Sequence, residues 1–187
     1  ALAGGAESMS RAPYIMPAAR WGQKMGDVAA MDMLLGTLNC PFGTGHMGIT
    51  AENVAGEHEV TRAQQDAFAV LSQERAAAAI AAGHFAEQIV PVEVRRGRDT
   101  VAFDVDEHPK ATTLDKLAGL RPVFQKDGSV TAGNASGIND GAAALVLARA
   151  STAASAGLRP LARIIGYAHA GVRPEVMGIG PIPAVTK

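Results

Sequence analysis

The sequence is poor in cysteine, in aromatic residues and in net charge, and each shortage excludes a class of protein. Cys40 is the only cysteine in 187 residues, so no disulfide can form within the chain, as is usual in a reducing compartment. The formal net charge of -1 gives no general attraction to nucleic acid or to an anionic membrane. No apolar run is long enough to span a bilayer. We therefore expect a cytoplasmic protein that binds neither nucleic acid nor membranes.

What the sequence does contain is typical of a globular α/β protein. Hydrophobic residues make up 48% of the chain and charged residues 19%. Segments with helical periodicity alternate with apolar runs of strand length, which favours helices packed on sheets. Helices are expected at about 27–35, 48–56, 61–83 and 112–119, and in an Ala-rich stretch that ends at Gly157. Strands are expected at 1–9, 87–95, 99–107, 129–137 and 161–172, with a buried strand in the run after Ile138.

The segment from Thr61 to Gly83 gives the clearest helix signal. Thr61 and Gln64 fit a capping box, and Gly83 fits a helix stop. One side of the helix is predicted to pack against the protein; it carries Ala67, Phe68, Leu71, Arg75 and Ala78. The charged side chains of Asp66 and Glu74 are expected to be solvated.

The stretch "TAGNASGINDGAAALVL" (131–147) begins with residues that have almost no side chains. Small residues let a backbone approach a ligand closely, so a phosphate-binding loop is one interpretation. The motif lacks the Lys-Ser/Thr ending of a P-loop and contains no G-x-G-x-x-G. A tight turn between packed elements is the simpler interpretation, and the residues alone leave both open. Asn139 and Asp140 are expected to form a turn or a helix cap.

Few side chains in the sequence suit catalysis. Cys40 directly precedes Pro41, which predicts a loop and favours a structural cysteine over a nucleophile. His46 lies among glycines beside Phe42 and Met47, and it suits either a ligand-facing role or an ordinary loop position. The remaining histidines lack metal-ligand spacing, so no metal site is expected. The acidic residues Asp104 and Asp106 fall on one face of a predicted strand and are expected to be solvated.

Several strings, taken together and in order, resemble the thiolase family. They are "GGAESMSRAPY", "HMGITAENVA", "TRAQQDAFAVLSQERA", "LRPVF", "TAGNASGINDGAAALVL" and "MGIGPIPA". The resemblance covers nearly every residue from Gly4 to Ala184 and is strongest to the acetyl-CoA acetyltransferases and β-ketothiolases. It implies the five-layered αβαβα thiolase fold. It assigns residues 1–9 to the N-terminal core half, 10–138 to an inserted loop domain, 139–159 to the return into that half, and 160–187 to the start of the C-terminal half.

The resemblance also implies an activity for the whole protein. Thiolases condense two acetyl-CoA molecules to acetoacetyl-CoA, or cleave a 3-ketoacyl-CoA with CoA, through an acyl-cysteine intermediate. They need no cofactor, because the coenzyme A thioesters are substrates. Cys40 matches neither catalytic cysteine of the family, and we expect the catalytic segments to lie before Ala1 and after Lys187. The chain is therefore interpreted as an internal fragment with no catalytic residue of its own.

The residues that match the family's coenzyme A contacts are spread along the chain. Those that match the CoA-binding positions are Leu38, His46, Met47, Lys110, Leu117, Phe124, Ala132, Ala135 and Ser136. Met177 matches a methionine in the wall of the acyl pocket. Lys110 stands near the place where many members have an Arg, with the local spacing one residue shorter. Ser136 matches a serine that hydrogen-bonds the pantetheine, so the resemblance implies that the small-residue stretch accommodates that thin, largely apolar arm.

The segment around residues 10–32 matches the loop that joins two thiolase dimers into a homotetramer. Its Tyr14, Trp21 and methionines are typical of an interface. Two other interpretations stay open for the chain as a whole: a non-catalytic module for acyl-CoA binding or oligomerisation, and a thiolase-like lipid-transfer or condensing protein. "HMGITAENVA" and "GNASGINDGAAA" fit the degradative and biosynthetic thiolases better than this last group.

Overall fold

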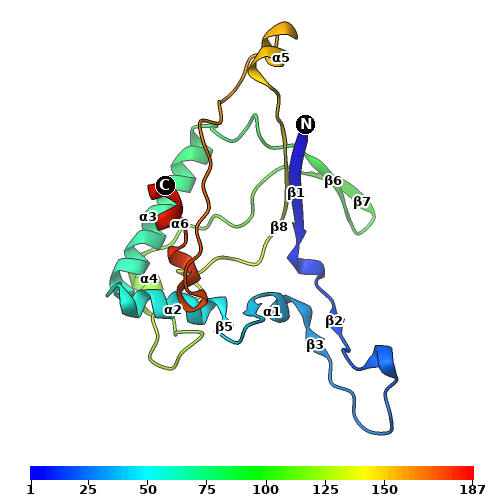
Figure 1. Cartoon of the computed structure of the whole chain (residues 1–187), viewed down its shortest axis with the longest axis vertical. Helices are drawn as coiled ribbons and strands as arrows, with labels where there is room; N and C mark the ends of the chain where they lie inside the picture. The colour runs from blue at the N-terminus through cyan, green and yellow to red at the C-terminus, as the bar shows by residue number, and fades with distance from the viewer. The chain divides into compact units, whose positions relative to one another are not determined.

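A computed structural model describes residues 1–187 (Figure 1). The chain divides into two compact units. The first contains Ala1–Val54 and Ile138–Lys187, and the second contains Ala55–Gly137. Helix α2 (Met47–Glu57) runs through the first point of division. The expected helix over residues 48–56 is therefore confirmed.

The first unit is built around an antiparallel strand pair. Strand β1 (Leu2–Ser8) pairs with β8 (Asp140–Val146) in a register that runs from Leu2 opposite Val146 to Ser8 opposite Asp140. Small residues let the two backbones and their neighbours approach closely: a Cβ on Gly4 would lie 2.6 Å from the Ala143 carbonyl oxygen. Every residue of both strands is exposed. The expectation of a buried strand after Ile138 was wrong for this chain, because nothing else in it covers either face.

The segment that follows β1 forms short elements only. Two-residue strands β2 (Tyr14–Ile15) and β3 (Met31–Asp32) pair with each other. Helix α1 (Met33–Thr37) starts later than the predicted 27–35, because the Asp32 side chain accepts a hydrogen bond from Leu34 N at 2.8 Å and caps it there. Strands β4 (Asn39–Cys40) and β5 (Gly45–His46) then form a tight hairpin.

The C-terminal part of the first unit contains α5 (Ala150–Ser155), a 3₁₀ helix (Pro174–Ile179) and α6 (Pro181–Thr186). Val176 in the 3₁₀ helix is 1% exposed, and the Asn53 side chain of α2 donates to the Glu175 carbonyl at 2.9 Å. These contacts anchor the 3₁₀ helix on α2. The strand expected at 161–172 is absent: this segment has no strand partner in the chain and stays exposed over most of its length.

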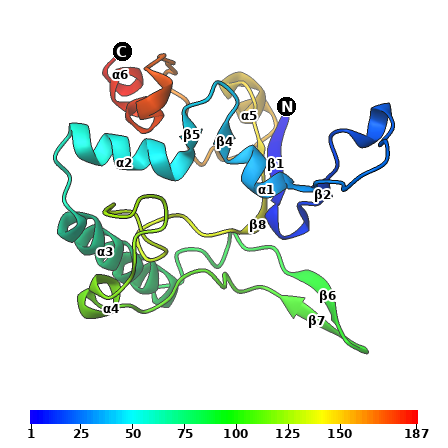
Figure 2. The same cartoon turned by 90° about the horizontal axis from the view of Figure 1, so that it is seen from below.

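The second unit contains two helices and a hairpin (Figure 2). Helix α3 (Arg62–Ala81) has the predicted capping box at Thr61 and Gln64, and Gly83 follows its end with φ +73°. Helix α4 (Leu114–Ala118), capped by Thr113, packs against α3. Strands β6 (Val92–Arg96) and β7 (Asp99–Phe103) form the hairpin, with Gly97 at φ +65° in its turn. These helices and strands follow the sequence prediction, with shorter strands.

The packed face of α3 is not the one predicted from sequence. Phe68 on the expected face is 67% exposed, whereas Asp66 is 4% exposed. The buried or half-buried positions in the first three turns of the helix include Arg62, Gln65, Asp66 and Ala69, so a largely polar stripe faces the unit there. The prediction failed because the periodicity of apolar residues identifies the packed face of a helix only when the buried side chains are themselves apolar.

Two further expectations about the second unit need correction. Residues 129–137 form turns rather than a strand, because their hydrogen bonds go to side chains and to near neighbours in the sequence. Strand β7 ends at Phe103, so Asp104 and Asp106 lie after the strand and do not share a strand face. Only two hydrophobic residues of this unit are buried, namely Leu117 and Val130.

Candidate functional site

Residues Thr131–Gly137, which we call the small-residue loop, form a compact turn in the second unit. Thr131 is fully buried, and its carbonyl accepts from Asn134 N at 3.3 Å and from Ala135 N at 3.1 Å. Gly133 N donates to Thr131 Oγ1 at 3.2 Å. Ala132, Ala135 and Ser136 lie exposed on this turn. The loop therefore presents a surface of small side chains and one hydroxyl, which offers little steric obstruction to a thin ligand.

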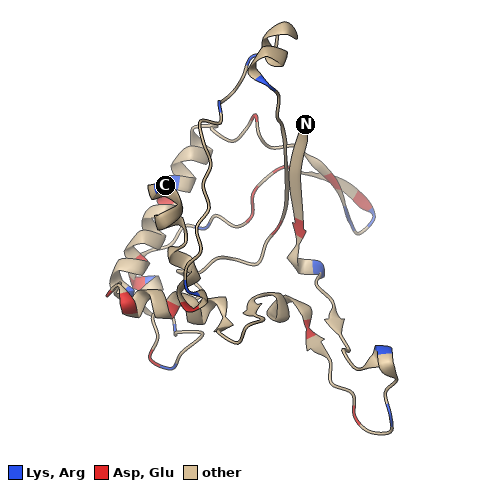
Figure 3. Ribbon diagram, viewed as in Figure 1, with Lys and Arg blue, Asp and Glu red and all other residues tan.

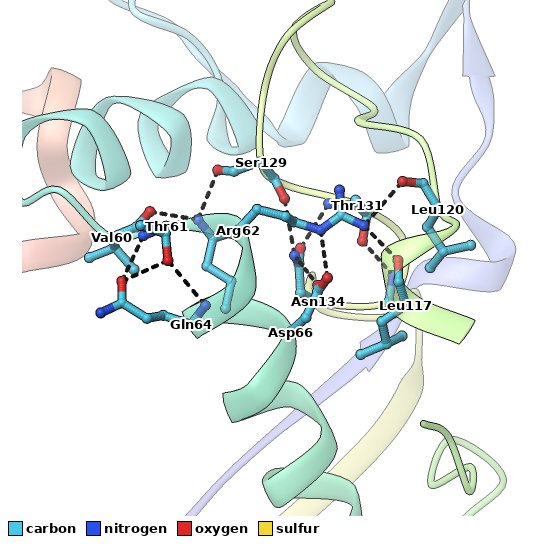
Figure 4. Close-up of polar contacts among 12 residues, drawn as sticks. Val60, Thr61, Arg62, Gln64, Asp66, Leu117, Leu120, Ser129, Thr131 and Asn134 are labelled. Atoms are coloured by element: carbon cyan, nitrogen blue, oxygen red, sulfur yellow. Dashed lines mark hydrogen bonds and ion pairs between the residues drawn. The ribbon is translucent and has the colours of Figure 1, made fainter. Parts of the chain in front are cut away.

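Polar side chains of α3 form hydrogen bonds to the small-residue loop and to Ser129 before it (Figure 4). Asn134 Nδ2 donates to Asp66 Oδ1 at 2.9 Å and to the Ser129 carbonyl at 3.0 Å, and Asn134 Oδ1 accepts from Thr131 N at 2.7 Å. Gln65 Nε2 of α3 donates to Ser129 Oγ at 2.8 Å. These bonds attach the start of the loop to α3.

Arg62 completes the same network (Figure 4). Its Nε forms an ion pair with Asp66 Oδ2 at 2.7 Å, and one terminal nitrogen donates to the carbonyls of Leu117 at 2.6 Å and Leu120 at 3.1 Å. The guanidinium thus satisfies carbonyls at the end of α4 while neutralising a buried carboxylate. We call Arg62, Asp66 and Asn134 the clamp. No motif in the sequence predicts the clamp, and its one local signal is the spacing of four residues between Arg62 and Asp66, which suits an ion pair on a helix.

The other predicted site residues of the second unit differ in their exposure. Leu117 is 4% exposed and lies beneath the small-residue loop: a Cβ on Gly133 would lie 2.4 Å from Leu117 Cδ2. Phe124 is half-buried, and Lys110 is exposed with its backbone N–H bonded to Gln73 Oε1 at 2.9 Å. Leu117 is thus placed under the loop, while Lys110 and Phe124 keep surface that a ligand could reach. Their contacts with a ligand stay a prediction.

Three of the predicted site residues of the first unit lie at the start of α2, namely Leu38, His46 and Met47. Leu38 accepts a backbone hydrogen bond from Met47 N at 2.9 Å, and His46 Nδ1 accepts from Gly48 N at 3.0 Å. The second bond caps the start of α2 and fixes the orientation of the imidazole ring. Met47 is exposed, and Met177 is exposed on the 3₁₀ helix that packs on α2. Gly43 and Gly45, both with φ +88°, allow the hairpin turn that brings His46 to this place.

Cys40 has polar neighbours in the turn between β4 and β5. The Thr44 side chain, followed by the backbone of Phe42 and of Thr44, lowers the pKa of the Cys40 thiol from its usual value. The cysteine is half-buried at the end of β4, in a hairpin rather than in the predicted open loop. The neighbours that lower its pKa are a hydroxyl and backbone groups, and none of them is a base, so the thiol is not arranged as a nucleophile paired with a base.

Asp140 lies where the chain re-enters the first unit. Its carboxylate accepts from the backbone N–H of Ser10 at 2.9 Å and from the Ser10 hydroxyl. The Ser10 hydroxyl and then the Ser10 backbone lower the pKa of this carboxyl. Asp140 therefore joins the segment after β1 to the first residue of β8, rather than capping a helix or closing a local turn.

Charged side chains show no concentrated site. Lys and Arg are spread over many elements (Figure 3), and Arg96 at the β6–β7 hairpin forms a long ion pair with Glu107 at 3.8 Å. No group of three or more His, Cys, Asp or Glu residues is arranged to hold a metal ion. None of the helices is long and apolar enough to cross a membrane. An apolar cleft beside the end of α3, lined by Ile80, Phe85 and Ile89, contains none of the predicted site residues.

Comparison with known proteins decides the family. The family model described as "Thiolase, N-terminal domain" matches residues 1–151. The chain belongs to the thiolase family. It is 58% identical, over 98% of its length, to the beta-ketothiolase BktB of Cupriavidus necator, of which it covers 47%.

Solved thiolase structures share the fold. The acetyl-CoA acetyltransferase of Bacillus anthracis matches with a TM-score of 0.94 and 49% identity, over 99% of this chain and 47% of that one. A human mitochondrial 3-ketoacyl-CoA thiolase in complex with CoA matches with a TM-score of 0.91 and 44% identity, over 99% of this chain and 46% of that one. The thiolase fold predicted from sequence is thus confirmed. The chain spans about half the length of the curated relatives it matches.

Proposed function

We propose that this chain is part of an acetyl-CoA C-acyltransferase. The whole enzyme would condense two molecules of acetyl-CoA, or cleave acetoacetyl-CoA or a longer 3-ketoacyl-CoA with CoA, as in fatty acid metabolism. The observation that carries the proposal is the 58% identity to a beta-ketothiolase over 98% of the chain. A neighbour of very similar structure was solved with CoA, which supports CoA thioesters as the substrates.

The chain's own contribution would be to bind coenzyme A. Ala132 and Ala135 present small apolar surface to the pantetheine arm, and the exposed Ser136 offers it a hydroxyl. Lys110 offers a positive charge for a phosphate group, as a point charge rather than a fork. The acyl-cysteine chemistry is assigned to cysteines other than Cys40, whose neighbours in the β4–β5 turn include no activating base.

The residues at the start of α2 would bind the same class of substrate. His46 has its ring orientation fixed by the bond from Gly48 N, and Leu38 and Met47 flank it. A fixed ring next to apolar side chains suits contact with the thioester end of pantetheine. Met177, exposed on its 3₁₀ helix, would contribute to the wall of the acyl pocket.

The first test is the intact mass of the polypeptide from its native source, followed by thiolysis of acetoacetyl-CoA. We expect a mass well above the 19.2 kDa of these residues, and CoA-dependent loss of acetoacetyl-CoA. A mass of 19.2 kDa without thiolysis would contradict the enzyme and favour a CoA-binding or oligomerisation module.

His46→Ala tests the binding role at the start of α2. We expect higher Michaelis constants for CoA and acyl-CoA, together with a loss of stability of about 1 kcal/mol, because the bond from Gly48 N that caps α2 is lost as well. His58→Ala is the matched control, since His58 is exposed at the end of α2. Unchanged Michaelis constants in His46→Ala would remove His46 from the site.

We also propose that the complete enzyme is a cytoplasmic homotetramer. The single cysteine supports a reducing compartment, and the exposed aromatic and methionine side chains of residues 10–32 support an interface.

A further inference from the structure

We propose that Asp66, together with Arg62 and Asn134, positions the small-residue loop for substrate binding without touching the substrate. The inference rests on the proposed function, because it concerns the loop assigned there to the pantetheine arm. It adds positioning residues to that site and a physical reason for the loop's shape.

The small-residue loop has hydrogen bonds within its own turn but few side-chain contacts that hold this turn in place on the protein. Apart from Thr131 and Asn134, its residues are Gly, Ala and Ser, which have small side chains and make few contacts. A binding surface that is not fixed in advance must be ordered by the ligand, which weakens binding. The loop therefore depends on contacts from outside, and its deepest side chain, Thr131, is fully buried.

Asn134 provides the contact from inside the loop. Both hydrogens of its amide nitrogen are used, one on Asp66 Oδ1 and one on the Ser129 carbonyl, and its oxygen receives the Thr131 N–H. One side chain thus ties together residues 129, 131 and 134 and links them to α3. Ala135 and Ser136, the residues proposed to meet the ligand, follow directly.

Asp66 connects this side chain to the structure beneath the loop. It is 4% exposed, so no substrate can reach it, yet each carboxylate oxygen has a partner: Asn134 on one side and Arg62 on the other. Arg62 continues to the carbonyls of Leu117 and Leu120. The side chains of these two leucines lie against Gly133 in the loop.

The clamp therefore holds the small-residue loop in place through two separate connections to Asp66. The loop's own turn is bonded to Asp66 through Asn134, and the leucines that support Gly133 are bonded to Asp66 through Arg62. A buried carboxylate with two charge-assisted hydrogen bonds tolerates little displacement, since losing either partner leaves one of its oxygens without a donor. Asp66 can set the loop's position through this network alone.

The test is Asp66→Asn in the protein at its native length, assayed by thiolysis of acetoacetyl-CoA. The new amide nitrogen faces either Arg62 Nε or Asn134 Nδ2, and both of these are donors, so one clamp bond must be lost. We expect the Michaelis constant for CoA to rise by about tenfold or more, with kcat within about threefold of the wild type. Amide hydrogens of residues 131–137 should exchange faster.

Glu74→Gln is the matched control, because it makes the same chemical change on an exposed position of the same helix. Its Michaelis constant and exchange rates should equal those of the wild type. Asn134→Ser is a milder second variant, since Asp66 keeps its ion pair with Arg62, and it should change the same two quantities in the same direction.

The outcomes separate the two proposals. Wild-type protein that neither binds CoA nor catalyses thiolysis would overturn the proposed function and this inference together. Active wild type with an unchanged Michaelis constant and unchanged loop exchange in Asp66→Asn and Asn134→Ser would overturn the positioning role alone. A fall in kcat with no change in Michaelis constant would also overturn it, because that result indicates general destabilisation.

Discussion

The surroundings of Cys40 give this residue a property that its sequence context did not reveal. Pro41 after the cysteine predicted a loop, but the structure places the thiol at the end of a two-residue strand, with Thr44 across the turn. Hydrogen bonding to a thiolate stabilises the charged form, so the thiol pKa is lowered. At a given pH below this pKa, a larger fraction of Cys40 is therefore thiolate than of an ordinary cysteine.

This lowered pKa predicts the pH dependence of alkylation. Iodoacetamide reacts with the thiolate, so the labelling rate of Cys40 should reach half its maximum at a lower pH than that of N-acetylcysteine. Thr44→Val should move the midpoint upward, because the largest cause of the shift is lost. Thr37→Val, whose hydroxyl bonds Met33 O in α1, should leave it in place. A midpoint at or above that of the free thiol would contradict the assignment.

Gly133 lies where its neighbours leave no room for a side chain. A Cβ there would lie 2.4 Å from Leu117 Cδ2 and 2.7 Å from Leu120 Cδ1. Gly133→Ala should lower the free energy of unfolding by about 1–3 kcal/mol, because the buried Leu117 has little room to move. Gly119→Ala is the control: its Cβ would be 3.8 Å from the nearest atom, so urea denaturation should show a change within about 0.5 kcal/mol. Equal effects of the two changes would contradict the close packing.

Among the elements, α3 shows most clearly what local sequence can determine. Thr61 accepts from Gln64 N, and the Gln64 side chain accepts from Thr61 N at 2.8 Å. Thr61→Ala should cost about 1 kcal/mol of stability through loss of this cap. Ser72→Ala, at an exposed position of the same helix, should change the denaturation midpoint little or raise it slightly. A Thr61→Ala midpoint equal to that of Ser72→Ala would show that the capping box contributes nothing.

The same helix shows where prediction from sequence stops. Its ends depend on residues three or four positions apart, and these were predicted correctly. Its packed face depends on Asn134, which is 68 residues from Asp66, and Asp66 was therefore predicted to be solvated. The strands expected at 129–137 and 161–172 failed for the same reason, because a strand needs a partner that no local pattern provides.

The candidate site also has one part that the sequence predicts and another part that it does not. The thiolase resemblance named residues that would face a ligand, and those assignments stay predictions. It did not name the side chains beneath them. Arg62, Asp66 and Asn134 come from α3 and the small-residue loop, and only the folded second unit brings them together. Their role can thus be inferred from the folded structure but not from sequence motifs.

At the scale of the whole molecule, the first unit exposes much apolar surface. Leu145 and Val146 of β8, and Ile164, Ile165 and Tyr167 in the unpaired segment, are all exposed, with Tyr167 at 93%. Exposed apolar side chains in such numbers mark places where protein contacts form. In the curated relatives, which are about twice as long as this chain, further residues are available to cover the corresponding surface.

The segment at residues 10–32 is a separate exposed surface, and it supports the proposed tetramer. Trp21 is 86% exposed at the end of a 3₁₀ helix (Ala19–Trp21), and Met25 is fully exposed, on a connection whose elements are no more than three residues long. Aromatic and methionine side chains are enriched in interfaces, and the central ones contribute most of the binding energy. If this segment joins two dimers, removing the Trp21 side chain should break the tetramer and leave each dimer intact.

Sedimentation velocity on the protein at its native length checks this. We expect the wild type to sediment as four copies and Trp21→Ala as two, with thiolysis of acetoacetyl-CoA retained, because the segment contributes none of the proposed CoA contacts. Phe68→Ala is the matched control, since Phe68 is another exposed aromatic residue, on α3, and it should remain a tetramer. A Trp21→Ala protein that still sediments as four copies would move the interface elsewhere, and the exposed β1–β8 pair would then be the surface to test.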